Sequence, residues 1–337
     1  MLLLIAAMAS FVATLFITPY IIRYFRFIRI VSADVHKKGK PSIPSSAGVP
    51  LVAGILAGIL VYVFLTVFIY NNRTALVEIF AAATSIMIIM FSGFVDDINS
   101  AQVKIAGYRE GKRGLKRFQK PLLTIPAAIP LMAILAGGSV MNIPLLGPID
   151  FGIFYSLLIV PIAVVGASNM INMLGGFNGL EVGMGLVYTF SLGLFALIHN
   201  STTAALILFS TFASLLVIFK FNFYPAKILA GDSLTYTLGA VVAASAIIGR
   251  LQRATLLTMI PFLIQGILKF YSYYKMGRYA SDLGILQKDG TIKSKYDKIY
   301  SWTHFVMKLG NMTERKIVLI MIGIQVLFSI IPFLNLL

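Results

Sequence analysis

Long apolar segments constrain this chain more than any other feature of its sequence. Ten of them have close to the ~17–25 residues that a membrane-spanning helix needs, and 58% of the 337 residues are hydrophobic while only 12% are charged. They cover residues 2–22, 49–70, 75–95, 121–137, 152–171, 181–198, 203–219, 233–249, 254–274 and 316–336. The sequence therefore predicts an all-α membrane protein and not a soluble globule with one core. Four prolines inside these segments should bend them, namely Pro126, Pro130, Pro161 and Pro261.

The positive charges are distributed unevenly between the loops. Of the 28 Lys and Arg residues, 25 lie in or beside the odd-numbered loops, and the even-numbered loops hold only Arg73, Arg250 and Arg253. By the positive-inside rule the odd-numbered loops are cytoplasmic and both termini lie outside. The net charge of +16 is then explained by cytoplasmic loops near anionic membrane lipids, and no nucleic-acid partner is expected.

The rest of the composition indicates one domain. Cysteine is absent, which excludes disulfides and thiolate metal sites. The first apolar segment lacks a basic leader and a small-residue cleavage site, so we expect a retained span. We treat residues 1–337 as one integral-membrane domain whose ninth loop, residues 275–315, can fold outside the membrane. Within this loop residues 284–292 predict a β-hairpin, because Asp289-Gly290 favours a type I′ turn.

Two adjacent carboxylates, Asp96 and Asp97, follow the third apolar segment. An ionised Asp costs about 2.5–3.5 kcal/mol at a bilayer centre on insertion scales, so we expect the pair at the water boundary. A divalent cation or nearby lysines would relieve their mutual repulsion. Taken alone, the pair is equally well explained as a polar cap that ends a span. Lys120 opens the fourth segment at membrane depth, where it needs an anionic partner.

The fifth loop, residues 169–181, is polar yet holds no basic residue. Asn169 and Asn172 are spaced to share one helix face, and the three glycines that follow permit close backbone approach to a ligand. Asn178 and Glu181 stand at the start of the next span, where backbone N–H groups point outward. The loop therefore predicts a ligand site, with a helix-breaking turn capped by Asn as the alternative.

A third carboxylate, Asp232, opens the eighth segment after Gly231. It is explained either as a helix cap or as part of an oxygen-rich pocket, because it lies at the depth of Asp96, Asp97 and the Asn amides. Oxygen ligands without Cys or clustered His suit Mg²⁺, which binds through one or two carboxylates plus substrate phosphates. An anion site beside a divalent-metal site at a membrane surface indicates phosphoryl chemistry on a lipid.

Three motifs, in order and on one side of the membrane, resemble those of the polyprenyl-phosphate N-acetylhexosamine-1-phosphate transferases. The family's paired-Asp motif is similar to residues 94–97. Its Asn-x-x-Asn-x-x-x-Gly-x-Asn-Gly motif is similar to residues 169–179, although the first Gly of the pair is one residue early. Its Pro-Ala-x-x-x-x-Gly-Asp motif is similar to residues 225–232. The likeness extends over nearly the whole chain.

Within that family the chain looks like the dolichol branch, the archaeal-type UDP-GlcNAc–dolichyl-phosphate GlcNAc-1-phosphotransferases. Residues 34–49, 178–181 and 307–315 carry this likeness. The His-rich ninth loop of the peptidoglycan branch is missing, because His304 is the only histidine there. The Arg-His-x-x-Arg-type run of the dolichol branch is missing as well, and Arg278 is its stand-in.

The resemblance implies transfer of N-acetylhexosamine-1-phosphate, specifically GlcNAc-1-phosphate, from a UDP-sugar to dolichyl or another polyprenyl phosphate. The products would be a lipid-linked sugar pyrophosphate and UMP, in the first membrane step of glycan assembly for N-glycosylation. The resemblance also implies Mg²⁺ or Mn²⁺, a homodimer, and a ninth loop that recognises substrate. The short even-numbered loops favour the cell membrane of a prokaryote, and the positive-inside rule places the active site on its cytoplasmic side. The implied catalytic residues are Asp96, Asp97 and Lys120, the metal ligands are Asn172 and Asp232, and the substrate-binding residues are Lys37, Asn178, Gly179, Glu181, Arg278 and His304.

Two alternatives stay open. One is a sister enzyme that uses another UDP-sugar or undecaprenyl phosphate. The other is a secondary transporter in which Asp96, Asp97 and Asp232 bind ions or protons. Transporter sites lie near the membrane midplane, commonly at a repeat interface, and this sequence shows no internal repeat.

Overall fold

Membrane-length helices dominate the computed structural model, which describes residues 1–105, 119–143 and 146–334. Eight helices in these ranges are long and apolar enough to cross a membrane, or up to nine if one bent pair counts as a single span. The long helices are α1 (Leu2–Phe27), α2 (Gly48–Phe64, continued by a π-helical turn over Leu65–Ile69), α3 (Leu76–Ile105), α6 (Val160–Asn172, preceded by a π-helical turn over Tyr155–Ile159), α7 (Leu180–Ile198), α8 (Thr202–Asn222), α9 (Gly231–Ile248) and α13 (Glu314–Leu334). The prediction of an all-α membrane protein is confirmed.

Two of the ten predicted spans are broken where prolines interrupt the helix. The segment predicted at 121–137 consists of α4 (Gln119–Thr124), a 3₁₀ turn (Ile125–Ala128) and α5 (Ile129–Ala133). The segment predicted at 254–274 consists of α10 (Gln252–Thr258) and α11 (Ile260–Met276), which meet at 61°. Pro126, Pro130 and Pro261 lie at these breaks. Proline lacks the N–H that would continue the helical ladder, so the chain bends there.

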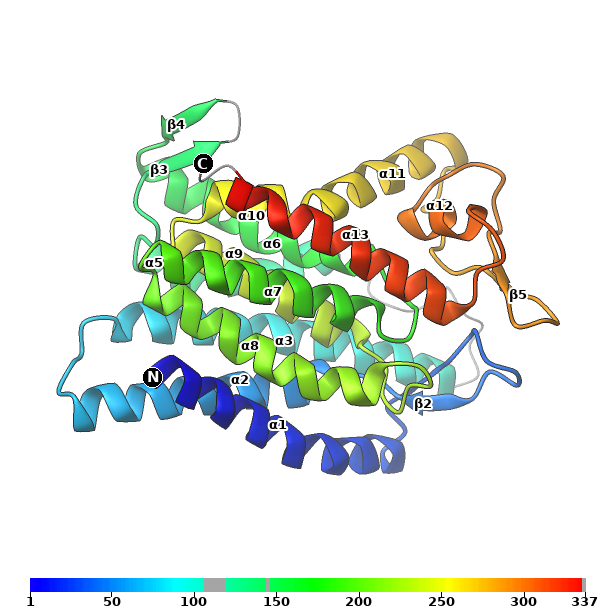
Figure 1. The fold of residues 1–337 in the computed structure, drawn as a ribbon, viewed down its shortest axis with the longest axis horizontal. Coiled ribbons are helices and arrows are strands. Elements are labelled where there is room, and N and C mark those ends of the chain that lie inside the picture. The colour runs from blue at the N-terminus through cyan, green and yellow to red at the C-terminus, as the bar shows by residue number, and fades with distance from the viewer. Residues whose placement is uncertain (106–118, 144–145, 335–337) are drawn as a thin grey trace.

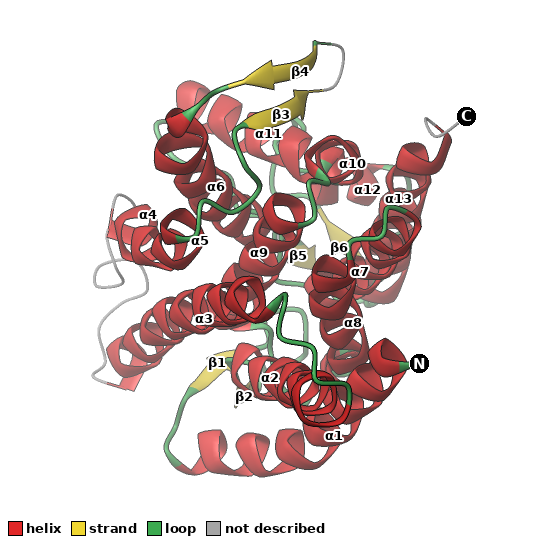
Figure 2. Cartoon of the chain, turned by 90° about the vertical axis from the view of Figure 1, so that its left-hand side faces the viewer, coloured by secondary structure: helices red, strands yellow, loops and turns green. Residues whose placement is uncertain are grey.

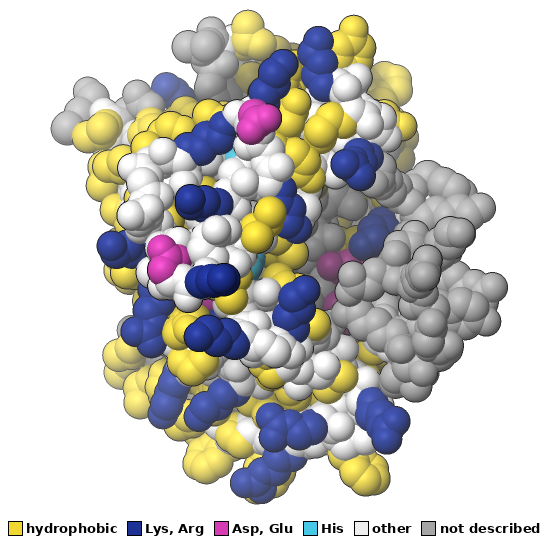
Figure 3. All heavy atoms as spheres, turned by 90° about the vertical axis from the view of Figure 1, so that its right-hand side faces the viewer, with side chains coloured by type: hydrophobic (Ala, Val, Ile, Leu, Met, Phe, Trp, Pro, Cys, Tyr) yellow, Lys and Arg dark blue, Asp and Glu magenta, His cyan; other side chains and the backbone are white. Residues whose placement is uncertain are grey.

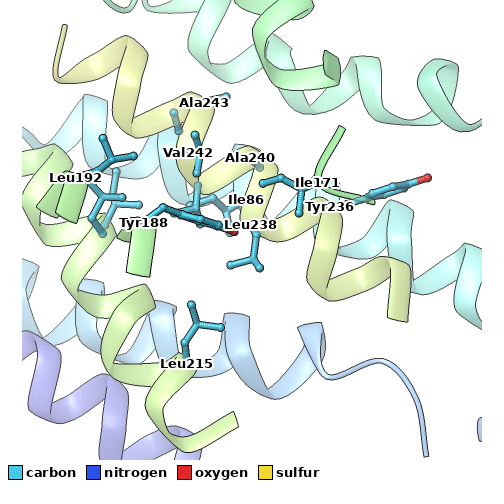
Figure 4. Close-up of a cluster of buried hydrophobic side chains, with 14 of the residues drawn as sticks. Ile86, Ile171, Tyr188, Leu192, Leu215, Tyr236, Leu238, Ala240, Val242 and Ala243 are labelled. Carbon is cyan, nitrogen blue, oxygen red and sulfur yellow. The ribbon is translucent and has the colours of Figure 1, made fainter. Parts of the chain in front are cut away.

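The helix α9 forms the centre of the bundle. Of its apolar window, 83% is buried, against 22% for α1 at the periphery, and it packs against α2, α3, α6 and α8. Small residues along α9 allow these close approaches, as is usual between membrane helices. Figure 4 shows Leu238, Ala240 and Val242 of α9 meeting side chains of α3, α6, α7 and α8 in this core.

The helix that carries the third apolar segment does not end at the acid pair. The helix α3 runs through Asp96 and Asp97 and continues to Ile105, so the expected end at Val95 is wrong. The pair therefore lies inside α3 and does not cap the end of that helix. Apolar side chains end at the membrane boundary, whereas the helical backbone continues past it.

The polar loops gather at one end of the bundle. The start of α1 and the end of α13 lie at the left in Figure 1, and the β1–β2 hairpin (Val31–Ala33, Ser42–Pro44), the β5–β6 hairpin (Ile285–Leu286, Ile292–Lys293) and α12 (Trp302–Lys308) lie at the right. Figure 3 faces the right-hand end and shows the Lys and Arg side chains collected there. A third hairpin, β3–β4 (Val140–Ile143, Gly147–Asp150), lies at the opposite, left-hand end.

The hairpin predicted in the ninth loop is confirmed, but its type I′ turn is wrong. The strands β5 and β6 pair antiparallel, with Leu286 opposite Ile292. A type I′ turn needs two residues with positive φ, and only Gly290 has one, at +84°, because Asp289 is not among the positive-φ residues. The Gly290 N–H donates to the carbonyl of Gln287 (3.1 Å). One left-handed glycine after the turn therefore closes a longer loop.

Candidate active site

Asp97 holds the first turn of α9. Its Oδ1 accepts from the backbone N–H of Asp232 (2.8 Å), and its Oδ2 accepts from the N–H of Ser233 (3.1 Å) and the hydroxyl of Ser46 (2.8 Å). The first N–H groups of a helix lack intrahelical partners and carry partial positive charge. A carboxylate from α3 therefore caps α9, so Asp232 does not have to cap its own helix.

Close backbone approach makes this cap possible. A Cβ on Gly93 of α3 would lie 2.5 Å from the carbonyl oxygen of Asp232, and one on Gly48 of α2 would lie 2.3 Å from the backbone of Ser233. Glycine therefore permits the contact of α2 and α3 with the start of α9. Three segments far apart in the sequence are thereby fixed at one point.

Lys120 lies between two carboxylates. Its Nζ is 2.5 Å from Asp96 Oδ2 and 2.7 Å from Asp232 Oδ2, and the Asp96 and Asp232 carboxyl groups are within hydrogen-bond reach of each other. Asp96 is buried, while the Lys120 and Asp232 side chains keep 29% and 24% of their surface exposed. One cation thus relieves the repulsion of two acids and stays accessible to a further anion.

Asn172, at the end of α6, completes this cluster. Its Oδ1 accepts from the Thr235 hydroxyl (2.9 Å), and its side chain also hydrogen-bonds to Asp232. Because α6 packs along α9, the last residue of α6 reaches the first turn of α9. The three acids, the lysine and one amide predicted from sequence therefore lie together.

A polar pocket of about 340 Å³ opens beside the cluster. Asp97, Asn172 and Asp232 line it on one side, and the loop over residues 175–178 lines it on another. Further walls come from the β1–β2 hairpin, through Asp34, and from the ninth loop, through Asp282 and Leu283. The pocket is therefore lined by segments that lie more than 200 positions apart in the sequence.

The loop after α6 is clamped from outside. The N–H of Asn178 donates to Glu314 Oε1 (2.9 Å), and its Nδ2 donates to Asp34 Oδ2 (2.8 Å). Gly179, with φ of +93°, donates its N–H to Asn222 (3.1 Å), and Glu181 accepts from the N–H of Gly176 (2.7 Å). Asn178 and Glu181 line the pocket. These contacts set the shape of the wall on which a ligand would lie.

Four residues predicted to bind substrate do not line this pocket, namely Lys37, Gly179, Arg278 and His304. Lys37 pairs with Glu314 and with Asp34 Oδ2 (3.5 Å), and its Nζ lies over the Tyr224 ring. His304 is fully buried, with Nε2 2.8 Å from the carbonyl of Ser281, and burial lowers its pKa. Arg278 is exposed in the ninth loop. The contacts of Lys37 and His304 tie loops together, and substrate binding by all four stays a prediction.

The ninth loop is fastened to the bundle by buried polar groups of α11. Lys269 Nζ pairs with Asp282 (2.7 Å), and Gln265 Nε2 donates both to Asp282 (2.9 Å) and to the carbonyl of Met173 (2.9 Å). Met173 directly follows Asn172. The loop is therefore tied to the end of α6 beside the acid cluster.

Asp34 and Glu314 were not assigned to the site from the sequence. Glu314 begins an apolar segment, and the same position marks Asp232, so this signal predicts a role for Glu314 as well. Asp34 lies in a basic loop. The only sequence signal for it is its place in the stretch that resembles the family. Asp34 is 5% and Glu314 3% exposed, so their burial distinguishes them from solvated loop charges.

The oxygens available to a divalent cation are those of Asp96, Asn172 and Asp232, because the Asp97 carboxylate already accepts three hydrogen bonds. No group of three His, Cys, Asp or Glu in the described ranges has the geometry of a metal site by itself. Mg²⁺ usually binds through one or two carboxylates and completes its shell with waters and substrate phosphates. The donor set fits that mode.

Comparison with known proteins identifies the family. A model described as glycosyl transferase family 4 matches residues 79–250. A protein of Saccharolobus solfataricus named UDP-N-acetylglucosamine–dolichyl-phosphate N-acetylglucosaminephosphotransferase is 34% identical, over 98% of this chain and 95% of its own. The chain belongs to glycosyl transferase family 4. A relative of the same name from Sulfolobus acidocaldarius is 31% identical over 98% of this chain and 94% of its own.

Another relative is less similar to this chain. A phospho-N-acetylmuramoyl-pentapeptide-transferase of Streptococcus thermophilus is 27% identical over 81% of this chain and 80% of its own. The region matched by the family model runs from α3 to the end of α9. It includes the whole Asp96–Lys120–Asp232 cluster, whereas Asp34, Glu314 and the ninth loop lie outside it. The chain is therefore a membrane transferase whose acid cluster lies in the region that the family model describes.

Proposed function

We propose that this chain transfers GlcNAc-1-phosphate from UDP-GlcNAc to dolichyl phosphate. An oxygen of the lipid phosphate attacks the β-phosphorus, a new P–O bond forms, and the bond from that phosphorus to the bridging oxygen breaks. The electron pair leaves with UMP, and the sugar stays on the lipid as a pyrophosphate. The names of the archaeal relatives support the substrates. The observation that carries the reaction type is Lys120, held between Asp96 and Asp232 beside a polar pocket.

The donor would lie across the 340 Å³ pocket. Its pyrophosphate would face Lys120, whose charge offsets the negative charge that develops as UMP leaves. Its uracil would face the 175–178 loop, where Asn178 is fixed through its N–H and Nδ2 and keeps its side-chain carbonyl as an acceptor. Asp232 and Asn172 would hold a divalent cation, Mg²⁺ or Mn²⁺, which supplies charge neutralisation and orientation of the pyrophosphate.

The lipid would lie in an apolar groove of about 240 Å³ on the outside of the bundle. The groove runs between α6, α9 and the bent α10–α11 pair, and it includes Met170, two residues before Asn172. An isoprenoid chain that packs in such a groove gains hydrophobic burial along its length. The phosphate at its end would then meet the acid and lysine cluster from the membrane side.

We place the active site on the cytoplasmic side of the cell membrane and expect a homodimer. The collection of Lys and Arg at the end that carries the acid cluster supports the orientation. The dimer rests on the family resemblance, and the mass of the detergent-solubilised protein tests it. A secondary transporter is a poorer explanation, because the acids lie near one set of helix ends and not at mid-membrane.

A substrate panel tests the proposal. Purified protein is given dolichyl or undecaprenyl phosphate with UDP-GlcNAc, UDP-GalNAc or UDP-glucose, with and without Mg²⁺, and nucleotide release is measured. We expect UMP only with UDP-GlcNAc and dolichyl phosphate, and loss of activity in Asp232→Asn. Asp150→Asn is the matched control, because Asp150 is exposed on β4 at the opposite end. Turnover by Asp232→Asn equal to that of the control would refute the proposal, and turnover with another sugar or lipid would correct the substrates.

A further inference from the structure

A second polar pocket, of about 490 Å³, lies at the end of the bundle opposite the acid cluster. Figure 2 faces this end, where α7, α10 and α13 lie side by side. Arg250, Arg253 and His199 line the pocket together with apolar walls from Phe195, Leu257 and Pro332. Among the residues that the structure describes, no acidic side chain lines it. The pocket is therefore both basic and apolar.

The two arginines are exceptions to the charge pattern of the chain. Only three Lys or Arg residues fall in the even-numbered loops, and two of them meet in this pocket. Cations on the outer side oppose the usual orientation of a membrane protein. Across the described ranges, neither guanidinium forms an ion pair. Their charge is thus available to a ligand.

The backbone holds one of these arginines in a demanding conformation. Arg250 has φ of +54°, a region that side chains other than Gly, Asn and Asp rarely adopt. It follows Gly249 at the end of α9, and its guanidinium faces Gly138 in the loop before β3. The side chain is thereby directed into the space between α9, α10 and the β3–β4 hairpin.

We propose that this pocket binds the phosphate headgroup of an anionic phospholipid in the outer leaflet. Arginine presents forked donors that match phosphate, and membrane-spanning helices end at this depth, where headgroups lie. The apolar walls would contact the start of the lipid chains, which a free phosphate ion lacks. The site is at the opposite end of the bundle from Lys120, so the bound lipid is not a substrate.

Lipid binding by variants tests this assignment. Purified protein is mixed with detergent micelles doped with phosphatidylglycerol or phosphatidylcholine, or with inorganic phosphate, and retained lipid and melting temperature are measured. We expect selective retention of phosphatidylglycerol, which Arg250→Gln/Arg253→Gln weakens roughly tenfold or more, the effect of losing a charge-assisted hydrogen bond. Arg73→Gln is the matched control, because Arg73 is the third outer cation and lies outside the pocket.

The single variant Arg253→Gln is a control for misfolding. Arg253 is exposed on α10, and its replacement does not change the backbone at Arg250. It should lose part of the affinity at an unchanged melting temperature without lipid. Equal affinity in the double variant and the unmodified protein would overturn the proposal. So would an equal loss in Arg73→Gln, or stabilisation by inorganic phosphate without selectivity between the two lipids.

Discussion

The two adjacent aspartates should respond differently to the same substitution. Asp97 accepts two backbone N–H groups of α9 and one hydroxyl, and an Asn there keeps one acceptor oxygen and turns an amide donor toward the remaining donors. Asp96 is buried with Lys120 as its ion-pair partner, and Lys120 retains Asp232. Asp97→Asn should therefore destabilise the fold, whereas Asp96→Asn should leave it intact.

The magnitude follows from the interactions that an amide cannot make at position 97. A hydrogen bond to a charged group contributes about 1.5–3 kcal/mol, and a charge at a partly buried helix terminus contributes up to about 2 kcal/mol. Removing one such bond and the charge at the α9 terminus gives about 3 kcal/mol for Asp97→Asn. Replacing one acid of a buried ionic cluster by an amide costs far less when the cation keeps another partner.

Thermal unfolding in detergent, followed by the fluorescence of Trp302, the single tryptophan, measures this difference. Asp97→Asn should melt roughly 5 °C or more below the unmodified protein, and Asp96→Asn should melt within about a degree of it while transfer is abolished. Equal melting temperatures for the two variants would refute the assignment of Asp97 to holding the first turn of α9 and of Asp96 to the transfer reaction.

Three further perturbations follow from particular contacts. Gly93→Ala should lower both melting temperature and activity, because its Cβ would meet the Asp232 carbonyl, whereas Gly323→Ala, on α13, has open space and should change neither. Glu314→Gln should raise KM for the UDP-sugar roughly tenfold with little change in kcat, because it removes the ion pair with Lys37 and the charge on the acceptor of the Asn178 N–H. An unchanged KM would contradict this. Burial and the Lys37 charge lower the pKa of His36 to about 4. The free energy of unfolding should therefore be highest above pH 6.5 and fall toward pH 4, where the unfolded chain binds more protons. His36→Phe should make the melting temperature less dependent on pH over that range.

Much of the bundle follows from apolar segment lengths. A run of about 20 apolar residues is stable in a bilayer as a spanning helix. The helices over residues 180–198, 202–222 and 231–248 therefore lie close to their predicted bounds. The breaks at Pro126 and Pro261 agree with the expected bends. The end of α3 was missed, because hydropathy reports where lipid ends and the backbone hydrogen bonds continue beyond it.

The membership of the acid cluster was predictable, whereas the division of labour within it was not. Asp96, Lys120, Asn172 and Asp232 each stand beside an apolar segment on the basic side, so one membrane depth brings them together. That Asp97 caps α9 depends on the register between α3 and α9, which short-range patterns do not encode. The contact of Glu314 with the Asn178 N–H joins residues 136 positions apart and needed the fold.

We expect Lys120, Asp232 and Asn172 to surround the pyrophosphate while the sugar-bearing phosphorus moves to the lipid. UDP-GlcNAc labelled with ³²P at the β-phosphorus, incubated with dolichyl phosphate and the purified protein, tests it most directly. The label should appear in the lipid fraction as a pyrophosphate-linked sugar, with unlabelled UMP in the water phase. Label recovered as UDP in the water phase would contradict the account.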